Sequence, residues 1–448
     1  MKILKMSKEE RSEIISMFIP TFAEQFFFAF VGMFITAVIK ESGMEAVAAV
    51  TLLNALVALF QQFFTSVGVG VMVSVAQLRG RGDPKVTGNT ASQALTLSFI
   101  ISIVVTALFY AFMEPLMFVI FRDSEPLVYE FGRIYLIYDI LSLPLVALHS
   151  TASSAIRGSG YPRISLIITL IYNGLYVAMG YTSVHWLNFG LHGISASLVL
   201  SRLFAAVAAI YFLQKGNKYM APTKIKLKIE RSVSRPIFRV AIPLLLESLI
   251  FSGGRLITQT FSVGYGTNSI AANGIAFTIH GFQLFPGMSM TGIAAPIVGR
   301  YCGKGDLEGA KRKGTQILVL TFFIATITCV LLFIFLKPLI ATMTDVPEVA
   351  AEVYKVAVSY CIMLPLFWTI GFGAPSILRS SGDGKFTSAV CITAMVVMRI
   401  TTGYLLTIVF KVGIIGIWIS MYLDWLVRDA FFLPRFKSGK WLQFKVLD

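Results

Sequence analysis

The chain has 448 residues, of which 56% are hydrophobic and only 14% are charged. A soluble globular protein has roughly a quarter of its residues charged, so this composition excludes an ordinary soluble domain and favours a lipid environment. The four cysteines show neither a CxxC motif nor Cys/His ligand spacing, which gives no support to a zinc site or a disulfide framework.

The formal net charge of +15 is explained by membrane topology and not by a nucleic-acid partner. A nucleic-acid-binding protein concentrates Lys and Arg on one folded face. Here the basic residues fall in alternate loops between apolar segments, as in LRGRGDPK, IRGSGYPR and GRYCGKGDLEGAKRK. Such an asymmetry is typical of loops on the cytoplasmic side, so we expect both termini to lie in the cytoplasm.

Apolar stretches of about 20 residues, each long enough to cross a bilayer core, recur along almost the whole chain. They predict an all-α polytopic protein of the cell (inner) membrane with twelve spans. The predicted spans lie near 14–38, 46–76, 88–112, 127–149, 163–183, 191–213, 237–262, 269–298, 312–336, 350–373, 386–409 and 414–434. The charged N-terminal stretch has no small-residue cleavage site after it and is expected to be a retained cytoplasmic leader.

The longest polar segment, residues 214–236, divides the predicted spans into two sets of six. We therefore predict an N-terminal six-helix lobe at 1–213, a cytoplasmic basic linker at 214–236, and a C-terminal six-helix lobe with a short tail at 237–448. Part of the linker, KIKLKIER, alternates basic and apolar residues. We expect it to lie on the anionic inner leaflet, with a regulatory or partner-binding role as the alternative.

The two halves repeat the same residues at an almost constant offset. Pro20 and Pro243 are separated by 223 positions, as are Glu24 and Glu247, and the loops GRGD (80–83) and GKGD (303–306). This regularity indicates a tandem duplication of a six-helix unit. Because each unit has an even number of spans, the two copies are expected to be parallel repeats, a standard plan of secondary transporters. The sequence contains no P-loop motif, so ATP is not expected to be the direct energy source.

The repeated segments resemble the multidrug and toxic compound extrusion (MATE) family of secondary transporters. The segments that carry the resemblance are EAVAAVTLLNAL, VSVAQLRGRGDPK, SAIRGSGYP, SIAANGIA, APIVGRYCGKGDLEGAKRKG, ILRSSGDGK, GIIGIWIS and RFKSGKW. The resemblance implies a V-shaped pair of six-helix lobes, alternating access, and cation- or proton-driven export of organic, often cationic, compounds.

One feature departs from that family pattern. Many prokaryotic members carry an Asp in helix 1, fifteen residues past the opening proline, and another in helix 5, four residues past an Asn. Here these positions are Ile35 and Val177, although the Asn is kept as Asn173. Coupling is therefore expected to use another site or another mode.

An ionisable group inside a membrane span is costly, so each one is a candidate for function. Glu247, four residues after Pro243, is the first candidate for a group that exchanges a proton or a sodium ion for substrate. The alternative is an ion pair with Arg255, on roughly the same helix face. Glu24 occupies the equivalent place in the first span, where the two related carboxylates could bracket a central cavity and share a cation. The alternative is that each serves as a polar lock near its own helix start, where the helix dipole favours negative charge.

Other span residues have weaker predictions. Asp139 is a coupling candidate, with an internal salt bridge to Arg133 as the alternative. Asp424 and Asp429 are expected to form a stabilising network with Arg428 in the last span. Two further residues complete the set: Arg399, which we expect to pair with an acid, and His280, a candidate proton relay.

Soft and aromatic side chains are expected to line a substrate cavity. Phe27 and Phe28 belong to a phenylalanine run in the first span, and Met33 follows them; Met288 lies in the eighth span. Aromatic faces attract organic cations, and methionine gives an adaptable apolar surface. The alternative for these residues is ordinary helix packing or lipid contact.

Together these observations predict a secondary active antiporter that exports small amphipathic, cationic organic compounds, driven by a proton or sodium gradient. The alternative is a flippase of lipids or lipid-linked oligosaccharides from the same superfamily. We expect no enzymatic activity, no cofactor beyond the coupling H⁺ or Na⁺, and no nucleic acid. The expected partners are a small organic substrate and the lipid bilayer, and the expected oligomeric state is a monomer.

Overall fold

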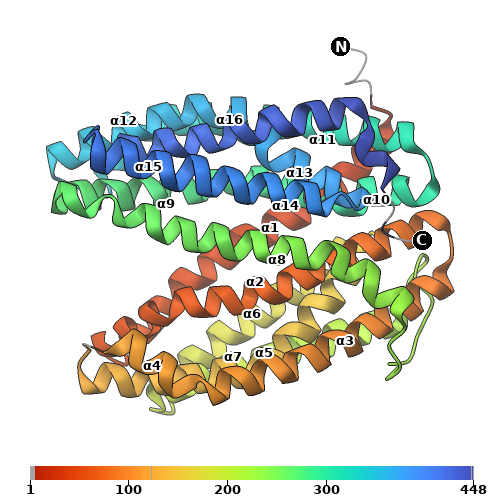
Figure 1. Ribbon diagram of the computed structural model, residues 1–448. Helices are drawn as coiled ribbons and strands as arrows, with labels where there is room; N and C mark the ends of the chain where they lie inside the picture. The colour runs from red at the N-terminus through yellow and green to blue at the C-terminus, as the bar shows by residue number, and fades with distance from the viewer. Residues whose placement is uncertain (1–5, 123, 445, 447–448) are drawn as a thin grey trace. The chain divides into compact units, whose positions relative to one another are not determined.

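Figure 1 shows the computed structural model of the protein, which describes residues 6–122, 124–444 and 446. Within these residues the regular elements are helices, apart from an isolated β-bridge between Asn217 and Met220. The chain divides into two compact units. The first unit comprises residues 15–241. The other unit comprises residues 6–14, 242–444 and 446 of the described chain.

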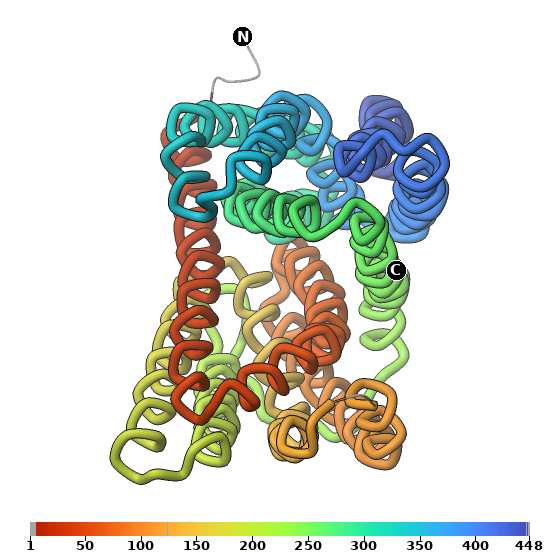
Figure 2. The backbone as a smooth tube through the Cα atoms, turned by 90° about the vertical axis from the view of Figure 1, so that its left-hand side faces the viewer, coloured from red at the N-terminus to blue at the C-terminus, as the bar shows by residue number. Residues whose placement is uncertain are grey.

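The unit of residues 15–241 is built from the first seven helices, apart from residues 8–14 of α1. They are α1 (Lys8–Lys40), α2 (Met44–Arg81), α3 (Pro84–Ala111), α4 (Met113–Phe121), α5 (Pro126–Gly158), α6 (Pro162–His185) and α7 (Gly190–Lys215). Helix α5 is central, because α2, α3 and α7 all pack against it. Both views show α1 as one uninterrupted helix (Figures 1 and 2), although Pro20 lies inside it.

The other unit contains the remaining helices, apart from residues 231–241 of α8. They are α8 (Arg231–Thr260), α9 (Thr267–Gly292), α10 (Ala294–Lys304), α11 (Leu307–Ala341), α12 (Pro347–Met363), α13 (Thr369–Ser381), α14 (Gly384–Thr393), α15 (Thr402–Tyr404) and α16 (Ile415–Ser438). Short 3-10 segments occur at Val263–Tyr265 and Lys440–Gln443. Wider π-helical turns at Leu364–Trp368, Ala394–Thr401 and Leu405–Val409 join α12 to α13, α14 to α15, and extend α15.

Ten helical segments of the described chain are long and apolar enough to cross a membrane. The predicted spans near 269–298 and 414–434 are not among these ten, but both are helical, as α9 with α10 and as α16. In α16, Asp424, Arg428 and Asp429 lie close together and lower the apolar character of the segment. The many large apolar side chains exposed on the helices are suited to lipid contact. The protein is an all-α, multi-pass membrane protein.

The repeated loops GRGD and GKGD form the same local structure in both units. Gly82 ends α2 in the left-handed conformation (φ 78°), and Gly305 ends α10 in the same way (φ 76°), which glycine adopts without a Cβ clash. The next residue then caps the following helix: Asp83 accepts backbone N–H bonds at the start of α3, and Asp306 does so at the start of α11. The sequence repeat is therefore also a repeat of helix stop and start signals.

The first turns of α1 are held by ion pairs within the unit that contains residues 242–444. Glu10 lies 3.0 Å from the fully buried ammonium of Lys313 on α11, and Glu13 lies 2.6 Å from Arg300 on α10. Ser7 and Glu10 also bond each other's backbone N–H groups, which forms a capping box. These contacts give the start of α1 a defined position in its unit.

Candidate functional site

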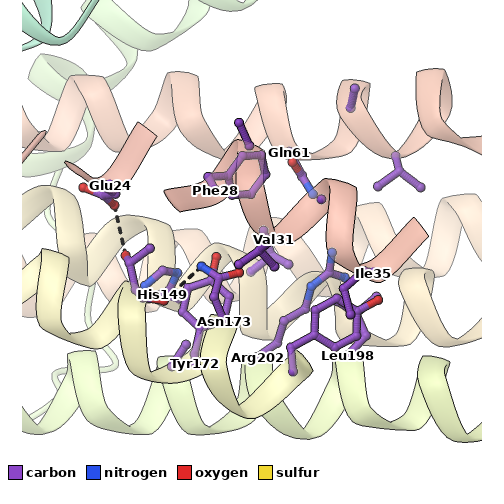
Figure 3. Close-up of a pocket in the computed structure, with 18 of the residues that line it drawn as sticks. Glu24, Phe28, Val31, Ile35, Gln61, His149, Tyr172, Asn173, Leu198 and Arg202 are labelled. Carbon is purple, nitrogen blue, oxygen red and sulfur yellow. Dashed lines mark hydrogen bonds between the residues drawn. The ribbon is translucent and has the colours of Figure 1, made fainter. Parts of the chain in front are cut away.

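A pocket of about 850 Å³ opens in the unit of residues 15–241, with walls from α1, α2, α5, α6 and α7 (Figure 3). Its volume lies in the range of pockets that hold drug-sized ligands. The lining mixes aromatic rings such as Phe28 and Tyr172 with amide side chains such as Gln61 and Asn173. Three charged side chains also line it, Glu24, Arg157 and Arg202, and each of them belongs to an ion pair.

The first ion pair joins Glu24 on α1 to Arg157 on α5, at 3.3 Å. Thr169 on α6 donates a second hydrogen bond of 3.0 Å to the same carboxylate (Figure 3). Both charged side chains remain partly exposed, 20% for Glu24 and 28% for Arg157. The carboxylate is therefore reachable from the pocket while it stays paired.

The second ion pair is more deeply buried. Arg202 on α7 donates from Nη1 to Oδ1 of Asp139 on α5 at 2.6 Å, and it also bonds the Ser142 hydroxyl. The Asp139 side chain is 1% exposed, whereas Arg202 lines the pocket. The expected salt bridge between Asp139 and Arg133 is thus wrong, because Arg133 pairs with Glu114 at 3.1 Å instead.

Both positions that lack the family's acids are apolar in their surroundings. Ile35 lines the pocket and is 6% exposed, and Val177 packs against the hydrophobic core. Asn173 also lines the pocket, but its amide donates to the backbone carbonyl of Thr169, one turn earlier in α6. The pocket's fixed positive charges come from two arginines, Arg157 and Arg202.

The four candidate lining residues have different positions. Phe28 and Met33 line the pocket, whereas Phe27 packs against the core of the same unit. Met288 belongs to the other unit and is 46% exposed. Adjacent residues on a helix point about 100° apart, so Phe27 and Phe28 face different surroundings. A run of adjacent phenylalanines therefore does not indicate by itself which ring faces a cavity.

His149 is a pocket residue to which the sequence gave no role. It lies on α5, its ring packs edge-on against Tyr172 at 5.3 Å, and its Nε2 has no hydrogen-bond partner among the described residues. An unsatisfied ring nitrogen at a pocket wall can bond a polar group of a ligand. The sequence signal that could have pointed to His149 is the pair of charged residues on the same helix, Asp139 and Arg157.

In the other unit, Glu247 on α8 pairs with Arg379 on α13. Arg379 Nη2 donates to Glu247 Oε2 at 2.5 Å, and the Ser388 hydroxyl on α14 donates to the same oxygen at 2.8 Å. This pair replaces the expected one with Arg255. It also repeats the arrangement of the first unit, in which Arg157, 222 positions before Arg379, bonds Glu24.

Deeper in the same unit, a second cluster surrounds Asp424. Arg428 donates to it from Nε at 2.9 Å, and Arg399 approaches it at 3.9 Å, so the expected stabilising network is present for these residues. Asp429, the other acid expected in this network, lies close to Gly371 and is not part of the ion pair between Arg428 and Asp424. Both guanidinium groups also lie over the ring of Phe251.

His280, the candidate proton relay, lies in an aromatic cluster. Its ring packs 4.4 Å from that of Tyr360 and 5.7 Å from that of Trp418, and Trp425 is stacked nearby. Its Nδ1 has no hydrogen-bond partner among the described residues. These contacts favour a packing role over a relay.

Outside the pocket, Glu114 on α4 accepts hydrogen bonds from Tyr129 and Arg133. The Tyr129 bond, with the Arg133 bond second, holds the pKa of the Glu114 carboxyl below its usual range. Both partners of the ion pair are more than half exposed, so this pair is a surface feature outside the pocket.

Comparison with known proteins identifies the family. A sequence model of a protein family, described as MatE, matches residues 20–182 and again residues 243–405. The chain belongs to the MATE family. The two matched ranges start 223 residues apart, which is the offset of the repeated prolines and glutamates.

Relatives of this MATE protein extend over nearly its whole length. A probable multidrug resistance protein, NorM, of Thermotoga maritima is 24% identical over 98% of this chain and 95% of its own. YisQ of Bacillus subtilis, described as an uncharacterized transporter, is also 24% identical, over 98% of this chain and 97% of its own.

Solved structures agree on the fold. A crystal structure of MATE in the bent conformation superposes with a TM-score of 0.88 over 96% of both chains, at 18% identity. A transporter of the MOP superfamily from Pyrococcus furiosus superposes with a TM-score of 0.86 over 98% of both chains, at 19% identity. The predicted MATE-like fold, with twelve transmembrane helices in two lobes, is confirmed.

Proposed function

We propose that this MATE protein is a secondary active antiporter that exports small amphipathic, cationic organic compounds by alternating access. Its family membership and the relatives named as multidrug resistance proteins support this function. We place it in the cell (inner) membrane as a monomer with both termini in the cytoplasm. A proton or sodium gradient supplies the energy, and no other cofactor takes part.

The observation that carries the proposal is the pocket in the first unit. It has room for a drug-sized molecule, and its wall combines aromatic rings with amide and hydroxyl groups. Such a lining binds many related shapes, because aromatic contacts are tolerant while a few polar groups fix orientation. A polyspecific transporter needs this combination.

The charges of the pocket indicate how a cation would be held. The carboxylates of Glu24 and Asp139 are balanced by the guanidinium groups of Arg157 and Arg202, so the pocket walls carry no excess negative charge. An organic cation is then attracted by aromatic faces such as Phe28, or it must displace an arginine from a carboxylate. Glu24, whose pair is partly exposed, is the carboxylate that can change partner.

We assign the coupling step to the carboxylates of Glu24 and Glu247. Each accepts hydrogen bonds from one hydroxyl group and from one arginine. A proton or a sodium ion that binds the carboxylate competes with the arginine for the same oxygen atoms, which frees the guanidinium and changes the contacts between helices. Asp139 is buried against Arg202, so we do not assign the binding of the coupling ion to it.

The test is transport in proteoliposomes with a panel of fluorescent organic cations, under separately imposed pH and sodium gradients. One gradient should drive transport by the native protein, and Glu247→Gln should abolish it while the protein stays folded. Glu348→Gln is a matched control, because Glu348 is an exposed carboxylate in the first turn of α12.

Failure of both gradients to drive any cation would contradict the antiporter proposal. In that case the flippase function becomes the next to test, with fluorescent lipids in the same vesicles. Transport that persists at the native rate in Glu247→Gln would leave an antiporter but remove Glu247 from its coupling step.

A further inference from the structure

The linker between the two sets of helices is an extended strap bound to α3. We define the strap as residues 221–230. Its first N–H, from Ala221, bonds the carbonyl of Pro84 at the start of α3 at 2.8 Å. Ser92 then bonds both the carbonyl of Lys224, at 2.7 Å, and the N–H of Lys226, at 2.9 Å. The strap is therefore held in register along the helix and is not a loose linker.

Two more α3 side chains complete this attachment. The Thr96 hydroxyl donates to the carbonyl of Lys226 at 2.6 Å, and Gln93 accepts from the N–H of Glu230 at 2.8 Å. Ser92, Gln93 and Thr96 are all buried. An extended segment without a partner strand leaves backbone groups unpaired, which is costly at a membrane surface. Buried hydroxyl and amide groups of α3 supply the missing partners.

The attachment points show how far the strap extends along a membrane-spanning helix. From Pro84 to Thr96, α3 rises about 18 Å at 1.5 Å per residue. Since α3 is one of the candidate spans, the strap lies beside the first half of a helix that crosses the bilayer. In Figure 1 it lies at the end of its unit opposite α4. Arg79, in the last turn of α2, stacks its guanidinium on Tyr219 just before the strap.

The outer surface of the strap is both apolar and basic. Leu227 is 86% exposed and Ile225 is 47% exposed, and the side chains of Lys224, Lys226 and Lys228 are exposed between them. In an extended segment alternate residues point to opposite sides, so the three lysines share one side and the two apolar residues share the other. Glu230 is the one acid within the strap.

We propose that the strap is a binding site for anionic phospholipids, with Leu227 inserted among the acyl chains and Lys224, Lys226 and Lys228 on the headgroup phosphates. Exposed leucine beside lysine matches the boundary between headgroups and acyl chains, where apolar insertion and charge attraction add. Each lysine near an anionic surface increases binding on the order of 5-fold, so three give roughly 100-fold. Because α8 begins at Arg231, directly after the strap, the bound lipid also fixes the start of that helix.

The proposal is tested with a fluorescent reporter on the strap of the full chain. An environment-sensitive dye is attached to Leu227→Cys, in a background in which the two partly exposed cysteines are removed by Cys302→Ala and Cys361→Ala. The protein is placed in nanodiscs of phosphatidylcholine alone, or of phosphatidylcholine and phosphatidylglycerol in equal parts. We expect blue-shifted emission and protection from iodide in the anionic discs, both reduced by high salt.

Two charge-matched variants separate a lipid site from a general effect of charge. Lys224→Gln, Lys226→Gln and Lys228→Gln together should remove the response to phosphatidylglycerol. Lys85→Gln, Lys385→Gln and Lys440→Gln together remove the same charge from exposed lysines outside the strap and should keep the response. Thermal unfolding of both variants shows that the fold is intact.

Three outcomes would overturn the proposal. The first is equal emission in the two kinds of disc, and the second is a response that survives loss of the strap lysines or disappears equally in the control variant. The third is a blue shift in phosphatidylcholine discs when soluble glycerol phosphate is added, which would assign the site to a free phosphate compound. None of these depends on transport activity, so the result is independent of the proposed function.

Discussion

Arg379 donates a 2.5 Å hydrogen bond to Glu247, and Arg157, its counterpart in the first repeat, bonds Glu24. Each bond joins the first long helix of a repeat, α1 or α8, to a helix that is followed by a glycine with positive φ, Gly160 after α5 or Gly382 after α13. In both units a hydroxyl group, Thr169 or Ser388, bonds the same carboxylate. The duplication thus preserved a chemical unit and not only a pattern of helices.

The Glu247–Arg379 pair should show strong energetic coupling. Both side chains are less than 15% exposed, so Arg379→Met leaves a poorly solvated carboxylate and should destabilise the protein by roughly 3–5 kcal/mol. Adding Glu247→Leu to that variant should recover most of the loss. Thermal unfolding in detergent measures both, and additive losses in the double variant would show that the two residues are not coupled.

Arg202 should control how strongly the pocket attracts cations. Arg202→Met removes one positive charge and leaves Asp139 unpaired, so the pocket gains an excess negative charge. We expect tighter binding of organic cations and lower thermal stability, measured by ligand titration and by unfolding. The control is Arg202→Met with Asp139→Asn, which restores neutrality and should return cation affinity to the native level. Equal affinities in all three proteins would contradict the role given to the pair.

Phe27 and Phe28 form a matched test of the cavity wall. Phe28→Ala removes a ring from the pocket and should weaken aromatic cation binding by roughly 0.5–2 kcal/mol, or about 2- to 30-fold. Phe27→Ala removes a ring packed against the core and should instead destabilise the protein by roughly 2–4 kcal/mol. Ligand titration and thermal unfolding of each variant check this division, which the reverse pattern would refute.

Glu114 should contribute to stability only where it is ionised. Its folded-state pKa lies below its usual value, because Tyr129 and Arg133 bond the charged form. The contribution is therefore present above the unfolded-state pKa and is lost as the pH falls through the lower folded-state value. The difference in melting temperature between the native protein and Glu114→Gln should shrink from neutral pH to acid pH. A difference that stays constant would show that the carboxyl charge is not involved.

The membrane fold, the repeat and the family could all be predicted from the sequence, because these depend on local features. Long apolar runs must form helices in lipid, where every backbone group needs an internal partner. Stop and start signals such as Gly82 with Asp83 act within a few residues and are therefore visible as motifs. The paired glutamates could be found in the same way, from their constant spacing after a proline.

The partner of each buried charge could not be predicted from the sequence, because it depends on how the helices pack. Asp139 pairs with Arg202, which is 63 residues away, and not with its neighbour Arg133; Glu247 pairs with Arg379, 132 residues away, and not with Arg255. The rotation of each helix about its axis decides these partners, and it depends on packing against several other helices at once. The same rotation places Phe28 in the pocket and packs Phe27 against the core, since adjacent residues on a helix point about 100° apart.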